Sequence, residues 1–338
     1  MVEAVAMGQV PRDRNTRTRR TSTHRSQARF IARLLPGAKA SPFPGFIDPC
    51  LPTLKPRVPV GERWVHEIKH DGYSVQGHLI GGVPKLLTRR GHDSTHRMSS
   101  IAEAVAQLPA NNLVVDGEVI VPDKDGRGDF SALEAALGEG RHSQSMLFYL
   151  FDIMHLDGFD LRAAPLLDRK RVLAGLLENV RPPIIYSDYM EEDGELMFEH
   201  ACKLHLEGVV SKLRDAPYWS GRAETWIKVK CYSRGVFTIV GFEPEGKHRI
   251  AALHLANKSG RGSKATWTYV GKVGTGFSDV VSAALRKKLN ELQVERAATP
   301  INYRRSTIAV APILAAKIDY RSITADGKLR HAAFKGLV

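Results

Sequence analysis

Short apolar or alternating runs, rather than long amphipathic ones, dominate the hydrophobic pattern between Trp64 and Lys230. Runs of this length, bounded by Gly, Pro, Asn and Asp, predict β-strands. They are expected at 64–69, 73–80, 113–121, 146–154, 208–213 and 225–230. Two other segments, 168–180 and 195–206, repeat apolar residues with the helical period and predict helices. The pattern therefore predicts a mixed α+β domain.

The pattern changes after Cys231. Short strands are expected at 236–242, 250–256, 266–273 and 313–320, with one helix over 278–292. Ser278 is a suitable cap for this helix, and its apolar face is predicted to comprise Val281, Ala284, Leu285, Leu289 and Leu292. Short strands and one helix in basic surroundings suit a small β-barrel such as an OB-fold.

The N-terminal segment has a different composition. Residues 12–33 are rich in Arg, Ser and Thr and poor in acids, which predicts a disordered basic arm over 1–40. An organellar transit peptide has a similar composition and remains an alternative. Six prolines between Pro42 and Pro59 predict an extended lead-in. The expected organisation is therefore an arm over 1–40, a first domain over 41–232 and a second over 233–338.

Charge is distributed unevenly along the chain. The formal net charge of +13 combines +6 in residues 1–35, +11 in residues 233–338 and −4 between them. This distribution predicts that the two ends meet a polyanion while the middle carries out chemistry. No apolar run reaches the roughly 20 residues that span a bilayer. Three separated cysteines lack the spacing of a zinc site or disulfide framework, which favours the cytoplasm.

The candidate nucleophile is Lys69, which ends an apolar run and precedes Asp71-Gly72. By itself this pattern is also typical of a strand that enters an Asp-Gly hairpin, where most lysines are solvated. An amine attacks phosphorus only when it is neutral, and nearby cations favour that form. Lys228 and Lys230 alternate on one predicted strand, so both can face the same site and hold phosphate oxygens.

Glu118 and Glu207 are candidate ligands for Mg²⁺, which prefers hard oxygen ligands. Each has an ordinary structural alternative, because Asp116-Gly117 could be a plain turn and Gly208 a helix stop. Phe151 lies in an apolar strand and could be a core residue. The functional interpretation rests on all these features occurring together and in this order.

The combined motifs resemble those of the covalent nucleotidyltransferase superfamily, and within it the ATP-dependent DNA ligases. The likeness extends over residues 46–338 and is greatest to the ligase module of bacterial end-joining enzymes of the ligase D type. Further matching segments lie at 49–54, 88–91, 156–158, 217–222 and 329–331. The resemblance implies a nucleotidyltransferase (ATP-grasp-like) adenylation domain followed by an OB-fold.

The resemblance also implies a reaction and its residues. Lys69 would attack the α-phosphate of ATP, form lysyl-AMP, and pass AMP to a 5′-phosphate that a 3′-hydroxyl then joins. The implied cofactors are ATP and Mg²⁺, with Mn²⁺ as a substitute. The nucleotide site would contain Glu67 at the adenine amino group, Ile68, Phe151 stacked on the base, Glu118 near ribose and metal, Glu207 at the metal, Lys228 and Lys230 at the α-phosphate, and Arg89 at the nick phosphate.

The implied partner is duplex DNA with nicks or ends, and a Ku-like end-binding protein is a further candidate. The protein is expected to act as a monomer in the bacterial cytoplasm, near the nucleoid. Alternatives are an RNA ligase, a capping-type guanylyltransferase, and a non-catalytic protein that binds DNA breaks.

Two departures from the family pattern are Ser74, where arginine is usual, and the sequence end at Val338, where the family continues into an Arg-x-Asp-Lys segment. For Ser74, the expected consequence is slow nick sealing or compensation by Arg89 or Arg90. For the absent segment, it is weaker self-adenylation or substitution by Arg330 and Lys335.

Overall fold

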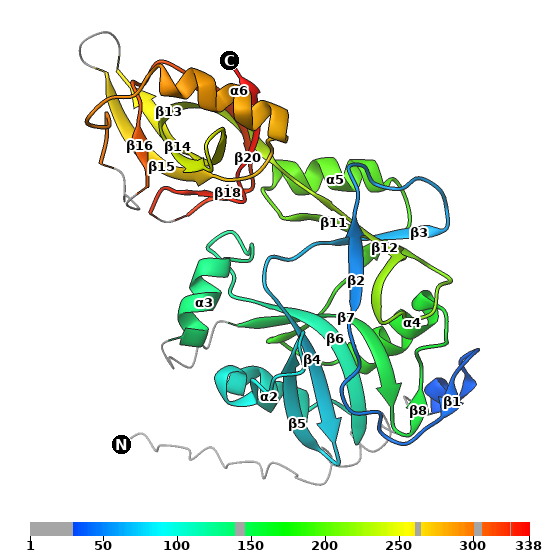
Figure 1. The fold of residues 1–338 in the computed structure, drawn as a ribbon. Coiled ribbons are helices and arrows are strands. Elements are labelled where there is room, and N and C mark those ends of the chain that lie inside the picture. The colour runs from blue at the N-terminus through cyan, green and yellow to red at the C-terminus, as the bar shows by residue number, and fades with distance from the viewer. Residues whose placement is uncertain (1–29, 139–145, 261–264, 301–305, 325) are drawn as a thin grey trace, which may run out of the picture. The chain divides into compact units, whose positions relative to one another are not determined.

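The computed structural model describes residues 30–138, 146–260, 265–300, 306–324 and 326–338. The chain forms two compact units, Met1–Lys230 and Cys231–Val338. Both units are drawn in Figure 1. We describe each unit by itself.

The larger sheet of the first unit has seven strands. Helix α2 (Ser99–Ala106) packs against β4 and β5, and α4 (Leu166–Leu177) packs against β7 (Figure 1). Apolar residues of the sheet, of these helices and of α3 (Phe130–Gly138) form one buried core. The strand order is β1 (Lys39–Ala40), β8 (Phe159–Asp160), β7 (Leu147–Leu156), β6 (Asn112–Ile120), β4 (Tyr73–Ile80), β5 (Val83–Thr88), with β9 (Ile184–Tyr186) parallel to β7.

A second sheet of five strands completes this unit. Its order is β10 (Tyr189–Met190), β3 (Trp64–Ile68), β11 (Gly208–Leu213), β12 (Gly221–Lys230), β2 (Cys50–Leu54). Helix α5 (Gly194–Lys203) contacts β11 and β3, and its first turn is capped by Asp193, which accepts the Leu196 N–H at 3.0 Å. Strand β2 arises within the proline-rich lead-in and pairs parallel with β12. It lies at the sheet edge, where a proline such as Pro52 is tolerated.

The lysine motif lies at the crossing between these two sheets. Strand β3 ends at Ile68 in the smaller sheet, whereas β4 begins at Tyr73 in the larger one. The hairpin alternative is therefore wrong, because β3 and β4 do not pair. A Cβ on Gly72 would lie 2.1 Å from the Val119 carbonyl oxygen, so this close approach requires glycine.

The turn alternative for Asp116-Gly117 is also wrong. Both residues lie inside β6, where Asp116 pairs with Gln76 on one side and with Asp152 on the other. Since Glu118 follows on the same strand, it belongs to the sheet rather than to a turn.

The second unit is built on a six-stranded antiparallel sheet with α6 (Asp279–Asn290) packed against β14. The predicted strands and helix are present, and Ser278 caps α6 by accepting the Val281 N–H at 3.3 Å. Val281 and Ala284 are exposed instead of lying on the predicted apolar face. The strand order is β15 (Thr266–Val273), β14 (Arg249–Ser259), β13 (Ser233–Glu245), β17 (Ala315–Tyr320), β20 (Ala333–Leu337), with β16 (Ile308–Ala309) beside β13 and a separate pair β18 (Ser322–Ile323) and β19 (Leu329–Arg330).

The structure differs from the sequence-based predictions for the N-terminal segment and for the cysteines. Residues 1–29 of the predicted arm lie outside the described residues, but its last part is ordered. Ala32 is fully buried in the core, and β1 pairs with β8. Cys202 and Cys231 are disulfide-bonded, contrary to the expectation from their spacing, and Cys50 is a free, buried thiol. Among the described residues, no helix is long and apolar enough to cross a bilayer.

His78 provides a pH-dependent test of the core. Its ring is 1% exposed on β4, and burial, followed by Lys85, lowers its pKa to about 4. An unfolded histidine titrates near pH 6.5, so between pH 6.5 and 4 the unfolded chain binds a proton that the folded chain does not. Stability should therefore fall as pH falls through this window, by about 3 kcal/mol in total. Urea denaturation of His78→Gln should show a shallower pH dependence, whereas exposed His92→Gln should match the parent; equal slopes in all three proteins would contradict the assignment.

Candidate nucleotide-binding site

A cavity of about 1010 Å³ lies in the first unit at the place where the two sheets meet. It brings together seven of the predicted site residues, which come from β3, β6, β7, β12 and the segments that follow β3 and β5. These residues are Glu67, Ile68, Lys69, Arg89, Glu118, Phe151 and Lys228. Glu207 and Lys230 do not line the cavity, but both are joined to Lys69 by ion pairs through the Glu207 carboxylate.

One end of the cavity is rich in lysine. The Lys69 Nζ lies 2.9 Å from Glu207 Oε2, and the Lys230 Nζ lies 3.1 Å from Glu207 Oε1. The backbone fixes this group, because the Lys69 N–H donates to the Gly208 carbonyl at 2.9 Å and Gly208 pairs with Lys230. Lys228 lies two residues earlier on β12, and its pKa is lowered by burial and then by Lys69 and Lys230. This end of the cavity therefore attracts anions such as phosphate.

Glu118 faces the same end from β6, directly across from Ser74 on β4. Burial raises the pKa of Glu118 to about 7; Lys69 lowers this value, and Glu207 raises it. The negative charges of Glu118 and Glu207 repel each other, and a divalent cation bound between two carboxylates stabilises their charged forms. Among the described residues, no group of three His, Cys, Asp or Glu side chains could enclose a metal. The pair suits Mg²⁺, which retains waters and takes phosphate oxygens as further ligands.

The other end of the cavity is aromatic. Phe151 and Trp226 meet edge to face with ring centroids 5.7 Å apart. The Lys212 Nζ lies 4.0 Å from the Trp226 centroid and 4.5 Å from the Phe151 centroid, within cation–π range. These rings give a flat, planar ligand an apolar surface on which to pack.

Glu67 provides a carboxylate at this aromatic end. Its Oε1 lies 2.9 Å from both Lys170 Nζ and Lys212 Nζ, while Ser187 Oγ donates to its Oε2 at 3.1 Å. The Lys212 contact is an ion pair without hydrogen-bond geometry, whereas Lys170 donates directly. The side chains of Glu67 and Lys170 are 3% and 0% exposed, so the carboxylate is held rigidly inside the wall.

His70 lies beside the nucleophile. Its ring stacks on Tyr149 at a centroid distance of 3.9 Å, and burial lowers its pKa to about 4 despite the opposing effect of Glu67. The ring is consequently neutral near pH 7 and adds no further positive charge beside Lys69.

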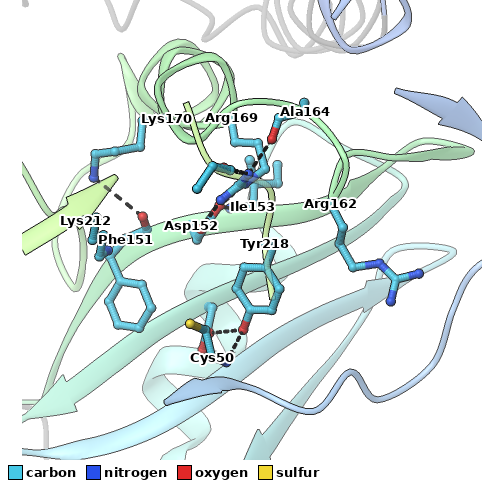
Figure 2. Close-up of polar contacts among 12 residues, drawn as sticks. Cys50, Phe151, Asp152, Ile153, Arg162, Ala164, Arg169, Lys170, Lys212 and Tyr218 are labelled. Carbon is cyan, nitrogen blue, oxygen red and sulfur yellow. Dashed lines mark hydrogen bonds and ion pairs between the residues drawn. The ribbon is translucent and has the colours of Figure 1, made fainter. Parts of the chain in front are cut away.

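A buried polar network supports the strand that carries Phe151 (Figure 2). The Asp152 carboxylate accepts two hydrogen bonds from the Arg169 guanidinium, at 2.7 and 2.9 Å, and both side chains are 0% exposed. In a second group, Tyr218 donates to Asp116 at 2.6 Å and accepts the Cys50 N–H at 2.9 Å. Burial raises the pKa of Asp116 to about 7.

Sequence reasoning did not identify three residues of this region: Arg169, Lys170 and Ser187. The first two were included in a predicted helix, where charged side chains usually face solvent. Asp152 and Lys212 lie within two of the predicted strands, 146–154 and 208–213, but no role was predicted for either. Only the tertiary structure reveals these partners, because Lys170 and Glu67 are 103 residues apart.

The chain is similar to known proteins over most of its length. Residues 58–230 match the family model described as "ATP dependent DNA ligase domain", and residues 246–337 match "ATP dependent DNA ligase C terminal region". The multifunctional non-homologous end joining protein LigD of Pseudomonas aeruginosa is 37% identical over 303 residues, which cover 88% of this chain and 36% of that protein. LigD of Mycolicibacterium smegmatis is 31% identical, with coverages of 82% and 36%. The chain thus spans about a third of the length of these relatives.

Solved structures agree with this assignment. A mycobacterial DNA ligase D complexed with ATP and MES matches with a TM-score of 0.52 and 26% identity, covering 86% of this chain and 95% of that one. The ligase domain of M. tuberculosis LigD gives 0.50 and 27% with the same coverages. With one family model covering half of the sequence and a second covering most of the remainder, this chain belongs to the ATP-dependent DNA ligase family.

Proposed function

We propose that this chain seals breaks in duplex DNA through a lysyl-AMP intermediate formed on Lys69. The observation that carries the proposal is one cavity with two chemically distinct ends. Lysines occupy one end, where a triphosphate can bind, and aromatic rings with Glu67 occupy the other, where a purine can pack. Lys69 lines the cavity at the lysine-rich end and would attack the phosphate nearest the nucleoside.

In the first step, the neutral Lys69 amine attacks the α-phosphorus of ATP. A phosphorus–nitrogen bond forms as the bond to the leaving pyrophosphate breaks, and the amine loses a proton. Lys228 and Lys230 would hold α-phosphate oxygens and stabilise the charge that develops there. In the structure the Lys69 nitrogen is paired with the Glu207 carboxylate at 2.9 Å, so this contact must open before attack. AMP then passes to a 5′-phosphate and is displaced by a 3′-hydroxyl.

Mg²⁺ would be held by Glu118 and Glu207. Burial raises the pKa of Glu118 to about 7, and the charge of Glu207 raises it further. A bound divalent cation would favour the ionised form of both carboxylates. When bound, the ion neutralises phosphate charge and polarises the bond to the leaving group. Mn²⁺ accepts the same oxygen ligands.

We further propose an OB-fold for the second unit and duplex DNA as its ligand. Support comes from its six-stranded antiparallel sheet with one helix and from the positive charge of residues 233–338. Contacts to DNA phosphate should make binding weaken steeply with salt. Two relatives are named for non-homologous end joining, so a monomer acting at ends held by a Ku-like protein completes the proposal.

The test is incubation of the purified chain with α-labelled ATP and Mg²⁺, followed by denaturing electrophoresis and addition of nicked duplexes. A covalent label that is discharged as a DNA nick is sealed supports the proposal. Sealing only of a nick in RNA would favour the RNA ligase alternative. If high ATP produces no label and pre-adenylated DNA is not sealed, a non-catalytic role in break binding follows.

Lys228→Met should reduce the rate of labelling by about 10- to 100-fold, because a half-buried cation at the lysine-rich end of the cavity is lost. Single-turnover labelling at saturating ATP measures the effect. Lys55→Met is the matched control, since Lys55 is exposed and pairs with Glu224 instead of lining the cavity. Equal rates in both variants would exclude a phosphate role for Lys228.

A further inference from the structure

We propose that Lys170 and Ser187 are positioning residues that fix Glu67 as the acceptor for the nucleobase. Base selection in this site would then depend on two side chains that bind no nucleotide themselves. The inference rests on the proposed function and extends it to the residues behind the cavity wall.

The contacts of Lys170 favour a positioning role. Its Nζ donates to Glu67 Oε1 at 2.9 Å and to the Ser187 carbonyl at 2.8 Å, with the Phe151 carbonyl at 3.5 Å. The Tyr186 and Tyr189 rings lie 4.8 and 5.3 Å from it. One ammonium therefore joins Glu67 on β3, Phe151 on β7 and the segment after β9 (Figure 2 shows its bond to Phe151).

The two oxygens of Glu67 are used unequally. Two ammonium groups lie against Oε1, whereas Oε2 accepts only the Ser187 hydroxyl among the described contacts. A carboxylate oxygen can accept more than one hydrogen bond, so Oε2 retains capacity for a ligand donor. Since Glu67 lines the cavity beside Phe151 and Trp226, that donor belongs to a base packed on these rings.

An acceptor held in this way discriminates between purines. The exocyclic amino group of adenine donates a hydrogen bond, whereas the oxygen at the same position of a 6-oxopurine presents a second acceptor. A buried acceptor that remains unpaired, or faces another acceptor, carries a desolvation cost. The discrimination is lost if Glu67 can turn away, and Lys170 and Ser187 prevent that movement.

Arg169 supports the same end of the site. It is the neighbour of Lys170 on α4 and binds Asp152, which follows Phe151 on β7. The two consecutive basic residues thus hold both the aromatic surface and the carboxylate.

The test compares ATP with inosine triphosphate, which carries oxygen in place of the amino group. We expect Lys170→Met to lower the ratio of their kcat/KM values for covalent labelling by about tenfold or more, through a raised KM for ATP. Lys170→Arg should retain most of the ratio, and Ser187→Ala should lower it to a smaller extent. Arg171→Met, at an exposed position next on the same helix, is the matched control.

An equal loss of labelling with both nucleotides in Lys170→Met, or an unchanged ratio in both Lys170→Met and Ser187→Ala, would overturn the inference. Dissociation constants for the two nucleotides, measured by calorimetry, give the same ratio without the covalent step. A wild-type chain that never labels would therefore disprove the proposed function, while the binding ratio still decides the role of Lys170.

Discussion

Replacing Lys69 with arginine is expected to lower covalent labelling by ATP by ~10³-fold or more, because arginine keeps the charge but offers no neutral amine near pH 7. A guanidinium can still pair with Glu207, which lies 2.9 Å from the lysine nitrogen, so the cavity should keep its structure. DNA affinity, measured by fluorescence anisotropy, should be unchanged. Single-turnover labelling with α-labelled ATP measures the chemical step.

The matched control is Lys85→Arg, which makes the same change at a half-exposed lysine paired with Asp93. Its labelling should equal that of the parent protein. Label that persists in Lys69→Arg and maps to another lysine would assign the nucleophile elsewhere.

The Arg169→Met variant should lose about 3–5 kcal/mol of stability, because Asp152 would keep a buried charge without its partner. Both side chains are 0% exposed, and Arg169 also donates to the carbonyls of Ala164 and Ala216 at 2.5 and 3.2 Å. Urea denaturation monitored by tryptophan fluorescence measures the effect.

Two comparisons isolate the ion pair in Arg169→Met. Arg171→Met, at the exposed pair with Asp168, should change stability by less than about 1 kcal/mol. Adding Asp152→Asn to Arg169→Met should recover part of the loss, since the unpaired charge is then gone. A double variant less stable than Arg169→Met would mean that the charge is not the cause.

The periodicity of the sequence located most elements because each strand and helix buries one face, and local pattern records which face that is. The pairing of strands is not local, and this explains the errors. The local pattern left a hairpin after β3 as an alternative, yet the chain passes from β3 in the smaller sheet to β4 in the larger one. Strand β2 was assigned to a lead-in because prolines are rare in strands, but an edge position tolerates Pro52.

The residues of the candidate site also fall into two groups: those that a local sequence motif identifies and those that only the tertiary structure identifies. Lys69, Glu67 and Phe151 were identified because their motifs are compact in sequence, and the structure places them on one cavity. Lys170 gave no local signal, since a lysine in a helix usually faces water. Its role becomes visible only after α4 packs against the strand that carries Phe151.

The parallel pairing of β2 with β12 has a consequence for biosynthesis. The Thr53 hydroxyl on β2 donates to the Ala223 carbonyl on β12, 170 residues later in the chain. The edge strand β2 and its partner β12 therefore emerge from the ribosome at different times. At synthesis rates of about 5–20 residues per second, the early strand waits roughly 10–30 s for its partner. The nucleotide site is therefore among the last parts of its unit that can form. A nascent chain released before Lys230 would carry the nucleophile but lack the wall that holds the phosphates.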